Sequence, residues 1–334
     1  MPEMWVQMVK PTVISTFAGC GGSSLGYQMA GFHELLAVEW DDNAVETFKL
    51  NFPGVPVYHG DIAKLTGDEC IKLAGIKCGE LDILDGSPPC QGFSTAGKRK
   101  FDDPRNSLFK EYARLLGELQ PKVFVMENVT GMVKGCMKQA YLKIIKTLRE
   151  CGYKAKSEVM NAMYFNVPQS RERVIIIGVR EDIGIEPSHP KPQGKPITIK
   201  EAWKDCPIEA APHLSPKLAG IIGKIPIWGD GGDVCGSYFS TKRLAWDKPS
   251  RTIIKGNVGS RACYIHPDGK RAITRAEIKR ISTFPDDYQF IGGYKMAIEL
   301  SGNSVPPNLM KAIAEHIKVN ILLTPALHEQ AVTA

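Results

Sequence analysis

The chain has 334 residues, of which 43% are hydrophobic and 23% charged, and these values are typical of a folded globular protein rather than a disordered one. Its 42 Lys and Arg outnumber its 36 Asp and Glu, so the formal net charge of +6 permits nucleic acid as a partner without requiring it. The nine cysteines form no C-x-x-C pair, the N-terminus has no apolar signal core, and no uncharged apolar run reaches the roughly 18 residues that cross a bilayer; we therefore expect a reduced, cytoplasmic protein without metal or membrane contact.

Short apolar runs alternate with segments of helical spacing from the N-terminus to about Arg180. The runs are TVISTFAG, LAVEW, LDILDG, KVFVMEN and RVIIIGV. This alternation predicts an α/β fold with a doubly wound, mostly parallel sheet, whose functional loops lie at the carboxyl ends of the strands.

The character of the chain changes after Arg180. The segment EDIGIEPSHPKPQGKP predicts a linker, and the Gly- and Pro-rich residues that follow predict a smaller, irregular β-rich domain. TRAEIKRIS and PPNLMKAIAEHIKVNILL predict helices. We expect a catalytic and cofactor-binding domain at 1–181, a small domain at 182–275, and a C-terminal segment at 276–334 that returns to the first domain.

A glycine-rich turn, FAGCGGSSLG, follows the first predicted strand and opens a helix. Gly19, Gly21 and Gly22 allow a ligand to approach the backbone closely. Ser24 replaces the last glycine of a dinucleotide fingerprint, which disfavours NAD and favours an adenosine ligand without pyrophosphate, such as S-adenosylmethionine. The alternative is that the glycines only form a tight strand-to-helix turn.

Three further residues suit an adenosine ligand. Glu39 ends the second predicted strand about 20 residues after the turn, where its carboxylate can accept hydrogen bonds from ribose hydroxyls. Trp40 can stack on the adenine, and Asp61, after VPVYHGDI, is placed to meet the adenine amino group.

The segment GSPPCQGFS presents Cys90 at the carboxyl end of the strand LDILDG. A thiolate is a strong nucleophile, and the Lys98, Arg99 and Lys100 that follow favour the anion or contact phosphate. The alternative is a buried structural cysteine, which the flanking Pro-Pro and Gln-Gly-Phe-Ser disfavour.

An acid and two arginines lie at other strand ends. Glu127 lies in VMENV, where apolar neighbours can raise a carboxyl pKa, although a solvated or capping carboxylate is the alternative. Arg171 and Arg173 in VPQSRERV should face the same side and bind an anion or a carbonyl, or else form a surface ion-pair cluster.

These parts together suit one reaction. Addition of a thiolate to C6 of cytosine, with hydrogen bonding at N3, turns C5 into a nucleophile that attacks a sulfonium methyl group. Loss of the C5 proton and elimination of the thiol then restore the ring. This chemistry requires the base to leave the stack.

The sequence resembles the DNA (cytosine-5)-methyltransferases of the bacterial restriction-modification type. The resemblance rests on FAGCGGSSLG, VEW, GDI, GSPPCQGFS, MENV, PQSRERVIIIG, RAITRAEIKRISTFPDDY and ELSGNSVPP, in the family's order through nearly the whole chain. It implies an S-adenosylmethionine-dependent methyltransferase fold, Cys90 as nucleophile, Glu127 as the group at N3, and Arg171 and Arg173 as groups that fix the cytosine and the acid. The implied cofactor-binding residues are Phe17, Gly19, Cys20, Gly21, Gly22, Leu25, Glu39, Trp40, Asp61, Ile62, Asn303 and Ser304.

The resemblance also implies double-stranded DNA as partner, S-adenosylhomocysteine as by-product, a monomer, and a possible cognate restriction endonuclease acting on the same site. Bases are then read by a short variable region of about 182–246, most plausibly by Trp228 to Arg243. The expected DNA contacts are Ser94, Lys98, Arg99, Lys242 and Arg243. For Lys242 and Arg243, nonspecific phosphate contact is the alternative.

Two other functions stay open on sequence. A tRNA-methylating branch of the same family differs by a Pro-Pro-Cys-Gln-Pro-Phe-Thr form, where this chain has Gly92 and Ser94. A catalytically silent DNA-binding scaffold is expected to lose Cys90, Glu127 or the cofactor loop, and all are present.

Overall fold

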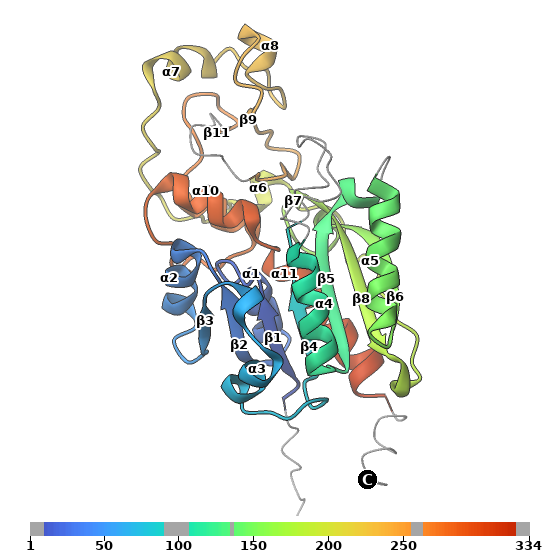
Figure 1. Cartoon of the computed structure of the whole chain (residues 1–334). Helices are drawn as coiled ribbons and strands as arrows, with labels where there is room; N and C mark the ends of the chain where they lie inside the picture. Colours follow the sequence, from blue (N-terminus) through green and yellow to red (C-terminus); the bar gives the residue numbers. More distant parts are fainter. Residues whose placement is uncertain (1–9, 90–106, 134–136, 255–262, 325–334) are drawn as a thin grey trace, which may run out of the picture.

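The computed structural model describes residues 10–89, 107–133, 137–254 and 263–324. Within these residues a seven-stranded sheet has the order β3-β2-β1-β4-β5-β8-β6. Its strands are β1 (Thr12–Thr16), β2 (His33–Glu39), β3 (Val57–His59), β4 (Ile83–Gly86), β5 (Val123–Val129), β6 (Tyr153–Asn161) and β8 (Glu172–Arg180). The first five strands in this order run parallel, whereas β8 is antiparallel to both β5 and β6. The predicted doubly wound, mostly parallel sheet is therefore confirmed (Figure 1).

Helices cover both faces of the sheet, because each strand carries apolar side chains on two sides. One face packs on α1 (Gly22–Met29) and α11 (Pro307–Ile317). The other packs on α3 (Gly67–Ala74), α4 (Ser107–Leu119) and α5 (Lys138–Glu150). A third apolar cluster joins α2 (Asp42–Asn51) to α10 (Tyr294–Asn303), so the C-terminal part of the chain lies against the N-terminal part.

All five predicted strand runs form strands, but two features were not predicted. Strand β6, YKAKSEVMN, is an edge strand that alternates polar and apolar residues with several exposed side chains, so it lacks the apolar run of a buried strand. The antiparallel direction of β8 was also not predicted, because an apolar run such as RVIIIGV carries no signal for strand direction.

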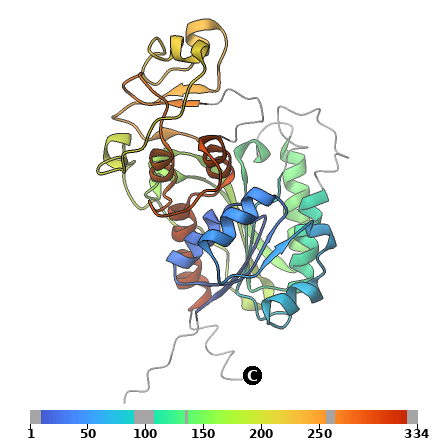
Figure 2. The ribbon, with the colours of Figure 1, turned by 90° about the vertical axis from the view of Figure 1, so that its left-hand side faces the viewer.

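A smaller, irregular part of the chain lies beyond the carboxyl ends of the parallel strands and stands apart from the large sheet in both views (Figures 1 and 2). Its elements are α6 (Ile199–Ala202), α7 (Pro216–Ile222), α8 (Gly232–Cys235), β9 (Thr241–Arg243), β10 (Ser250–Arg251) and β11 (Cys263–Ile265). Strand β9 pairs with β11, and β10 pairs with β7 (Gln169–Ser170).

The predicted division at residue 275 remains a prediction. One apolar cluster contains Trp203 and Tyr264 together with Ile278 and Ile281 of α9 (Arg275–Ser282). The Thr274 capping box, in which the Thr274 hydroxyl and the Glu277 carboxylate satisfy the first backbone N–H groups, begins α9. The small part therefore shares its core with the C-terminal segment.

Candidate active site

The glycine-rich turn is fixed by a carboxylate of the next strand. Gly19 and Gly21 have left-handed backbones, with φ values of 57° and 90°. The Gly19 N–H donates to Glu39 Oε2 at 2.8 Å, and the N–H groups of Trp40 and Asp41 donate to Glu39 Oε1 at 2.8 and 2.9 Å. Because a carboxylate offers about four lone-pair positions, these three bonds orient Glu39 and leave capacity for one further donor.

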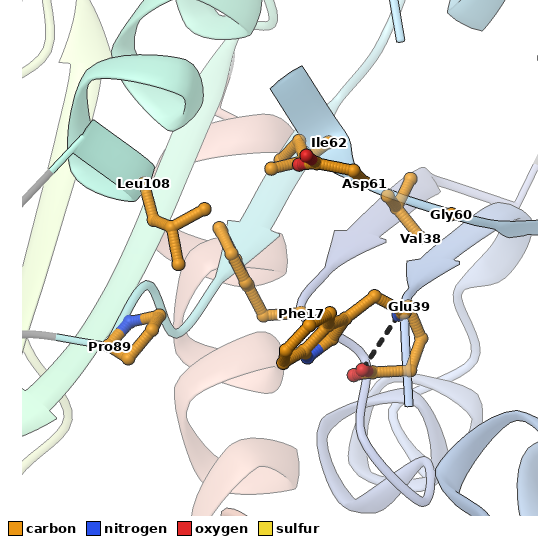
Figure 3. A pocket seen from close by; sticks show the side chains of 9 residues that line it. Phe17, Val38, Glu39, Gly60, Asp61, Ile62, Pro89 and Leu108 are labelled. Carbon is orange, nitrogen blue, oxygen red and sulfur yellow. Dashed lines mark hydrogen bonds between the residues drawn. The ribbon is translucent and has the colours of Figure 1, made fainter. Parts of the chain in front are cut away.

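A cavity of about 200 Å³ lies beside this turn at the carboxyl ends of β1, β2 and β4 (Figure 3). Its lining residues are Phe17, Val38, Glu39, Trp40, Gly60, Asp61, Ile62, Pro89 and Leu108. Phe17 has a φ of 55°, and such strain in a residue with a side chain gathers at functional sites. Five of the residues predicted to bind the cofactor thus line one cavity, in which apolar and aromatic walls meet two carboxylates.

The other predicted cofactor residues lie behind the turn. At Gly22 a Cβ would lie 1.8 Å from Ser304 Oγ, and at Gly21 it would lie 2.4 Å from the Phe52 ring. These two glycines are needed for packing against the protein itself, whereas a Cβ at Gly19 would meet nothing within 4 Å. Close ligand approach, the reason given on sequence for all three, therefore fits only Gly19.

The turn at Asn303 and Ser304 follows α10 and packs on the start of α1. Cys20 is buried there, its Sγ donates to Leu300 O at 3.5 Å, and burial raises the pKa of its thiol to about 12. Leu25 packs against the apolar cluster that joins α2 to α10. Ser304, which follows the end of α10 at Asn303, packs against Gly22 of the glycine-rich turn. Direct contact of Cys20, Leu25, Asn303 or Ser304 with a cofactor stays a prediction.

The Pro-Pro turn lies next to the cavity. Pro89 is part of the cavity wall, and Asn128 Nδ2 donates to Pro88 O at 3.0 Å. Cys90 lies outside the described residues, as do Ser94, Lys98 and Arg99. The structure nevertheless fixes the residue that immediately precedes Cys90 at the wall of this cavity.

Glu127 and Arg173 form an ion pair at the ends of neighbouring strands. Arg173 Nε lies 2.7 Å from Glu127 Oε1, and the two side chains are only 14% and 11% exposed. Glu127 lies on the same strand as Asn128, one residue before the group that binds Pro88. The predicted acid and one of its predicted arginines are therefore together, and the strand that carries the acid also holds Pro88 through Asn128.

Arg171 has other partners. It is 2% exposed, and its Nη1 and Nη2 donate to Ile253 O at 3.1 Å and Gly302 O at 3.0 Å. Burial lowers the pKa of Arg171 to about 9, so it stays cationic at neutral pH. Its guanidinium thus ties the small part and α10 to the start of β8, and a contact with cytosine stays a prediction.

The two predicted cations of the small part differ. Lys242 Nζ forms an ion pair of 2.8 Å with Asp230 and lines a second cavity of about 360 Å³. Arg243 donates to Ile225 O and to Pro267 O, at 2.8 to 3.2 Å. These bonds use the Arg243 guanidinium within the protein, so its contacts do not support the prediction that it binds DNA.

The second cavity was not predicted as a unit. Its lining residues are Ser170, Trp228, Lys242, Arg251, Thr252, Ile254 and Tyr264. The Arg251 guanidinium carbon lies 4.7 Å from the centre of the Trp228 ring, in a cation–π arrangement. Trp228 has a φ of 67°. The cavity combines cations, hydroxyls and an aromatic face next to the segment that carries Arg171.

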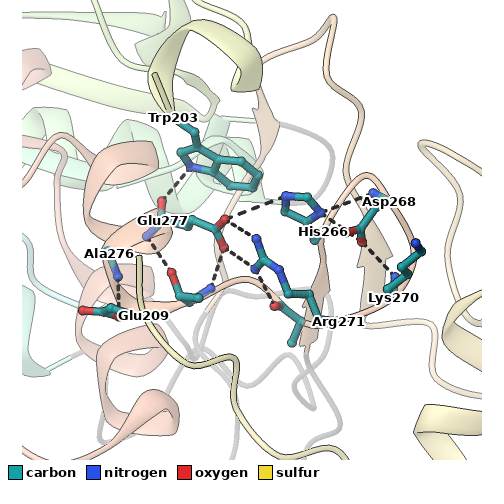
Figure 4. A network of polar contacts seen from close by, with 10 residues as sticks. Trp203, Glu209, His266, Asp268, Lys270, Arg271, Ala276 and Glu277 are labelled. Atoms are coloured by element: carbon teal, nitrogen blue, oxygen red, sulfur yellow. Dashed lines mark hydrogen bonds and ion pairs between the residues drawn. The ribbon is translucent and has the colours of Figure 1, made fainter. Parts of the chain in front are cut away.

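A network of polar contacts anchors this small part to α9 (Figure 4). Arg271 donates to both Glu277 oxygens at 2.7 and 2.8 Å. His266 stacks on Trp203 with ring centres 5.5 Å apart, and Trp203 Nε1 donates to Glu277 O at 3.1 Å. His266 directly follows β11, so the network fixes the position of β11 relative to α9.

Sequence reasoning missed Asn128 and Leu108. Asn128 directly follows Glu127, which was singled out, so its position in VMENV was the available signal. Leu108 lies at the start of α4 and carries no signal in the sequence beyond helical spacing. Among the described residues no cluster of three or more His, Cys, Asp or Glu could hold a metal ion, and no helix is long and apolar enough to cross a membrane.

Comparison with known proteins agrees with this geometry. A family model described as C-5 cytosine-specific DNA methylase matches residues 11–319. The chain is 36% identical to the Type II methyltransferase M1.HphI of Haemophilus parahaemolyticus, over 92% of this chain and 86% of that protein. It is 35% identical to M.Sau96I of Staphylococcus aureus, over 91% and 75%.

Among solved structures, a protein described as a DNA modification methyltransferase encoded within an Escherichia coli prophage has a TM-score of 0.79 at 24% identity, covering 94% of this chain and all of that one. Spodoptera frugiperda DNMT2 has a TM-score of 0.67 at 20% identity, covering 92% and 99%. These two likenesses establish the fold. Taken with the family match over almost the entire chain, they lead to one conclusion: the chain belongs to the C-5 cytosine-specific DNA methylases, enzymes that methylate cytosine in DNA.

Proposed function

We propose that this chain transfers a methyl group from S-adenosylmethionine to C5 of a cytosine flipped out of duplex DNA, with Cys90 as the nucleophile. One observation carries the proposal. Pro89, which directly precedes Cys90, is part of the wall of the cavity that suits the cofactor. Strand β5 carries both Glu127, which pairs with Arg173, and Asn128, which binds the Pro88 carbonyl.

The residues of the first cavity fit S-adenosylmethionine. The remaining lone pair of Glu39 suits a ribose hydroxyl, and Phe17, Trp40 and Ile62 offer apolar surface to a purine ring. Asp61 is an acceptor at the same wall, although its Oδ1 already accepts from Ala63 N at 3.0 Å. When bound, the cofactor supplies an electrophilic methyl group.

The protein's own groups act on the cytosine. The Cys90 thiolate adds to C6, and a proton shared between N3 and the Glu127 carboxylate neutralises the charge that moves into the ring, so that C5 becomes nucleophilic. After methylation, a water molecule takes the C5 proton, the electrons of that C–H bond restore the C5–C6 double bond, and the Cys90–C6 bond breaks to release the thiolate. Asn128 and Arg173 act by position: Asn128 holds the Pro88 backbone, and Arg173 orients Glu127.

Reading of the DNA belongs to the small part. We propose that phosphate or base edges contact the second cavity, where Lys242 and Arg251 supply charge and Ser170 and Thr252 supply hydroxyls. In this proposal, base contacts within the segment Trp228 to Arg243 set the recognition sequence. Ser94, Lys98 and Arg99 complete the DNA surface in this proposal.

We also propose that the protein acts as a monomer in the cytoplasm, alongside a restriction endonuclease of the same specificity. The seven cysteines that the structure describes are all free, which supports a reducing compartment. Relatives named Type II methyltransferases support the endonuclease.

Bisulfite sequencing of the DNA of host cells that express the protein tests the proposal. We expect one short sequence to contain protected cytosines, and none in cells that express Cys90→Ala. Cys78→Ala, at an exposed free cysteine, is the matched control and should methylate normally. Protected cytosines in cells that express Cys90→Ala would contradict the assignment of Cys90 as the nucleophile. Protected cytosines in tRNA instead of DNA would contradict the proposal that DNA is the substrate.

A further inference from the structure

A cluster of buried polar side chains lies beneath the glycine-rich turn, on the face of the sheet that α1 covers. Tyr27 Oη lies 3.3 Å from Asp85 Oδ1, and Ser24 Oγ donates to Glu34 Oε1 at 3.0 Å. Tyr27, Ser24, Asp85 and Glu34 are 0%, 1%, 3% and 8% exposed. Two buried carboxyl groups therefore connect α1 to β4 and to β2. The mechanism proposed above uses neither of them.

The two connected elements carry the two halves of the site. Helix α1 begins directly after Gly21, the end of the cofactor turn. Strand β4 ends at Gly86, three residues before Pro89 in the cavity wall. Thr16 Oγ1 also donates to Asp85 O at 2.9 Å, so both the main chain and the side chain of Asp85 are held. Asp85 is thus held between the two segments that border the first cavity.

Burial strongly disfavours the ionised form of both acids. Burial, followed by the charge of Glu34, raises the pKa of Asp85 to about 8, although the hydroxyls of Ser23 and Tyr27 oppose the shift. Burial raises the pKa of Glu34 to about 7. The groups that act on or face Asp85 are Ser23 and Tyr27 of α1, Glu34 of β2, Tyr112 of α4 and Glu127 of β5.

All the ionisable groups in this set are acids, so ionisation adds like charges to the core. Because a raised pKa means that the folded arrangement binds the proton more tightly than the unfolded chain does, the arrangement is less stable with these carboxyls ionised. The hydroxyl hydrogen bonds do not offset this cost. The native arrangement of α1, β2 and β4 around these carboxyls is therefore most stable when they are neutral, because the cost of burying a carboxylate exceeds the gain from its hydroxyl hydrogen bonds.

We infer that Asp85 and Glu34 are positioning residues for cofactor binding: as neutral carboxylic acids they hold α1 and its glycine-rich turn against β4, and their ionisation loosens this contact. The inference rests on the proposed function, because it takes the methyl-donor cavity as the site that is affected. Cofactor affinity should therefore fall as the pH rises from 7 to 9.

The test measures binding of S-adenosylhomocysteine by calorimetry between pH 6 and 9. Because Asp85 should be about one-tenth neutral at pH 9 and Glu34 still less so, wild-type affinity should be at least about tenfold weaker there than at pH 7. Asp85→Asn, which cannot ionise, should lose most of this dependence. Asp68→Asn, at an exposed acid that begins α3, is the matched control and should keep the wild-type profile.

Glu34→Gln keeps the test decisive if Asp85→Asn does not fold, and it should reduce the pH dependence in the same direction. Thermal unfolding at each pH separates loosening of the turn from loss of the fold. An unchanged profile in both variants, or loss of binding at every pH in a folded Asp85→Asn, would overturn the inference. Absence of wild-type binding at every pH would instead contradict the proposed function.

Discussion

Replacement of Glu34 by glutamine should make the protein more stable at neutral and alkaline pH. Glu34 is 8% exposed, and burial raises its pKa from 4.5 to about 7. Between these two values the unfolded chain releases the proton while the folded chain keeps it, so wild-type stability falls as the pH rises from about 4.5 to 7 and is not regained above 7. Glutamine has no proton to release, and its amide can keep a hydrogen bond with Ser24.

The size of the effect follows from the shift. A change from 4.5 to about 7 corresponds to roughly 3 kcal/mol at about 1.36 kcal/mol for each pH unit. The Glu34→Gln variant and the wild type should then be equally stable near pH 4, and the variant should be more stable by up to about 3 kcal/mol near pH 8. For a chain of this length that difference corresponds to roughly 5 °C in Tm.

Thermal unfolding followed by circular dichroism from pH 4 to pH 8 provides the assay. Glu46→Gln, at an exposed position of α2, is the control and should follow the wild type at every pH. Parallel curves for wild type and Glu34→Gln would refute the reasoning, because they would mean that Glu34 titrates equally in the folded and unfolded chains.

Three other changes test the site. Arg173→Gln leaves Glu127 without its partner in a mostly buried ion pair, and the loss of such a partner costs about 3 kcal/mol. If that energy holds Glu127 in its reactive position, single-turnover methylation should slow by about 100-fold. A near-normal rate would exclude Arg173 as the group that orients Glu127. Gly22→Ala places a Cβ 1.8 Å from Ser304 Oγ, so Tm and S-adenosylhomocysteine affinity should both fall, and wild-type affinity would show that this packing does not set the turn. Lys242→Gln should weaken DNA binding several-fold and reduce the slope of log affinity against log salt by about one, whereas an unchanged slope would mean that Lys242 only pairs with Asp230.

The sequence predicts the central sheet well, because buried parallel strands are apolar runs that few other structures produce. It does not predict β6, whose exposed side chains remove that signal at the sheet edge. The direction of β8 depends on its partners β5 and β6, which are distant in the chain. Strand pairing of this kind is a tertiary property.

The site follows the same division. Glu39, Trp40 and Asp61 could be assigned to one cavity because they end or follow strands of one sheet, and the carboxyl ends of such strands meet. Phe17 and Ile62 were implied only by the resemblance to the cytosine-5 methyltransferases. By contrast, the partners of Arg171 are backbone carbonyls 82 and 131 residues away, which its local sequence does not indicate. Likewise, position 22 requires glycine because Ser304, in the C-terminal part of the chain, leaves no room for a Cβ.

The buried acid Asp85 was likewise read only as part of an apolar run, since its partners come from α1 and β2. An acidic residue within an apolar run does not by itself indicate that burial raises the pKa of its carboxyl group.

The central claim is that Cys90 directs methylation of cytosine C5 in DNA. Purified protein, S-adenosylmethionine with a labelled methyl group, and a duplex containing the protected sequence should yield labelled 5-methyldeoxycytidine on nucleoside analysis by mass spectrometry. The Cys90→Ala protein should yield none while still binding S-adenosylhomocysteine. Label in any other nucleoside, or 5-methyldeoxycytidine formed by Cys90→Ala, would contradict the account.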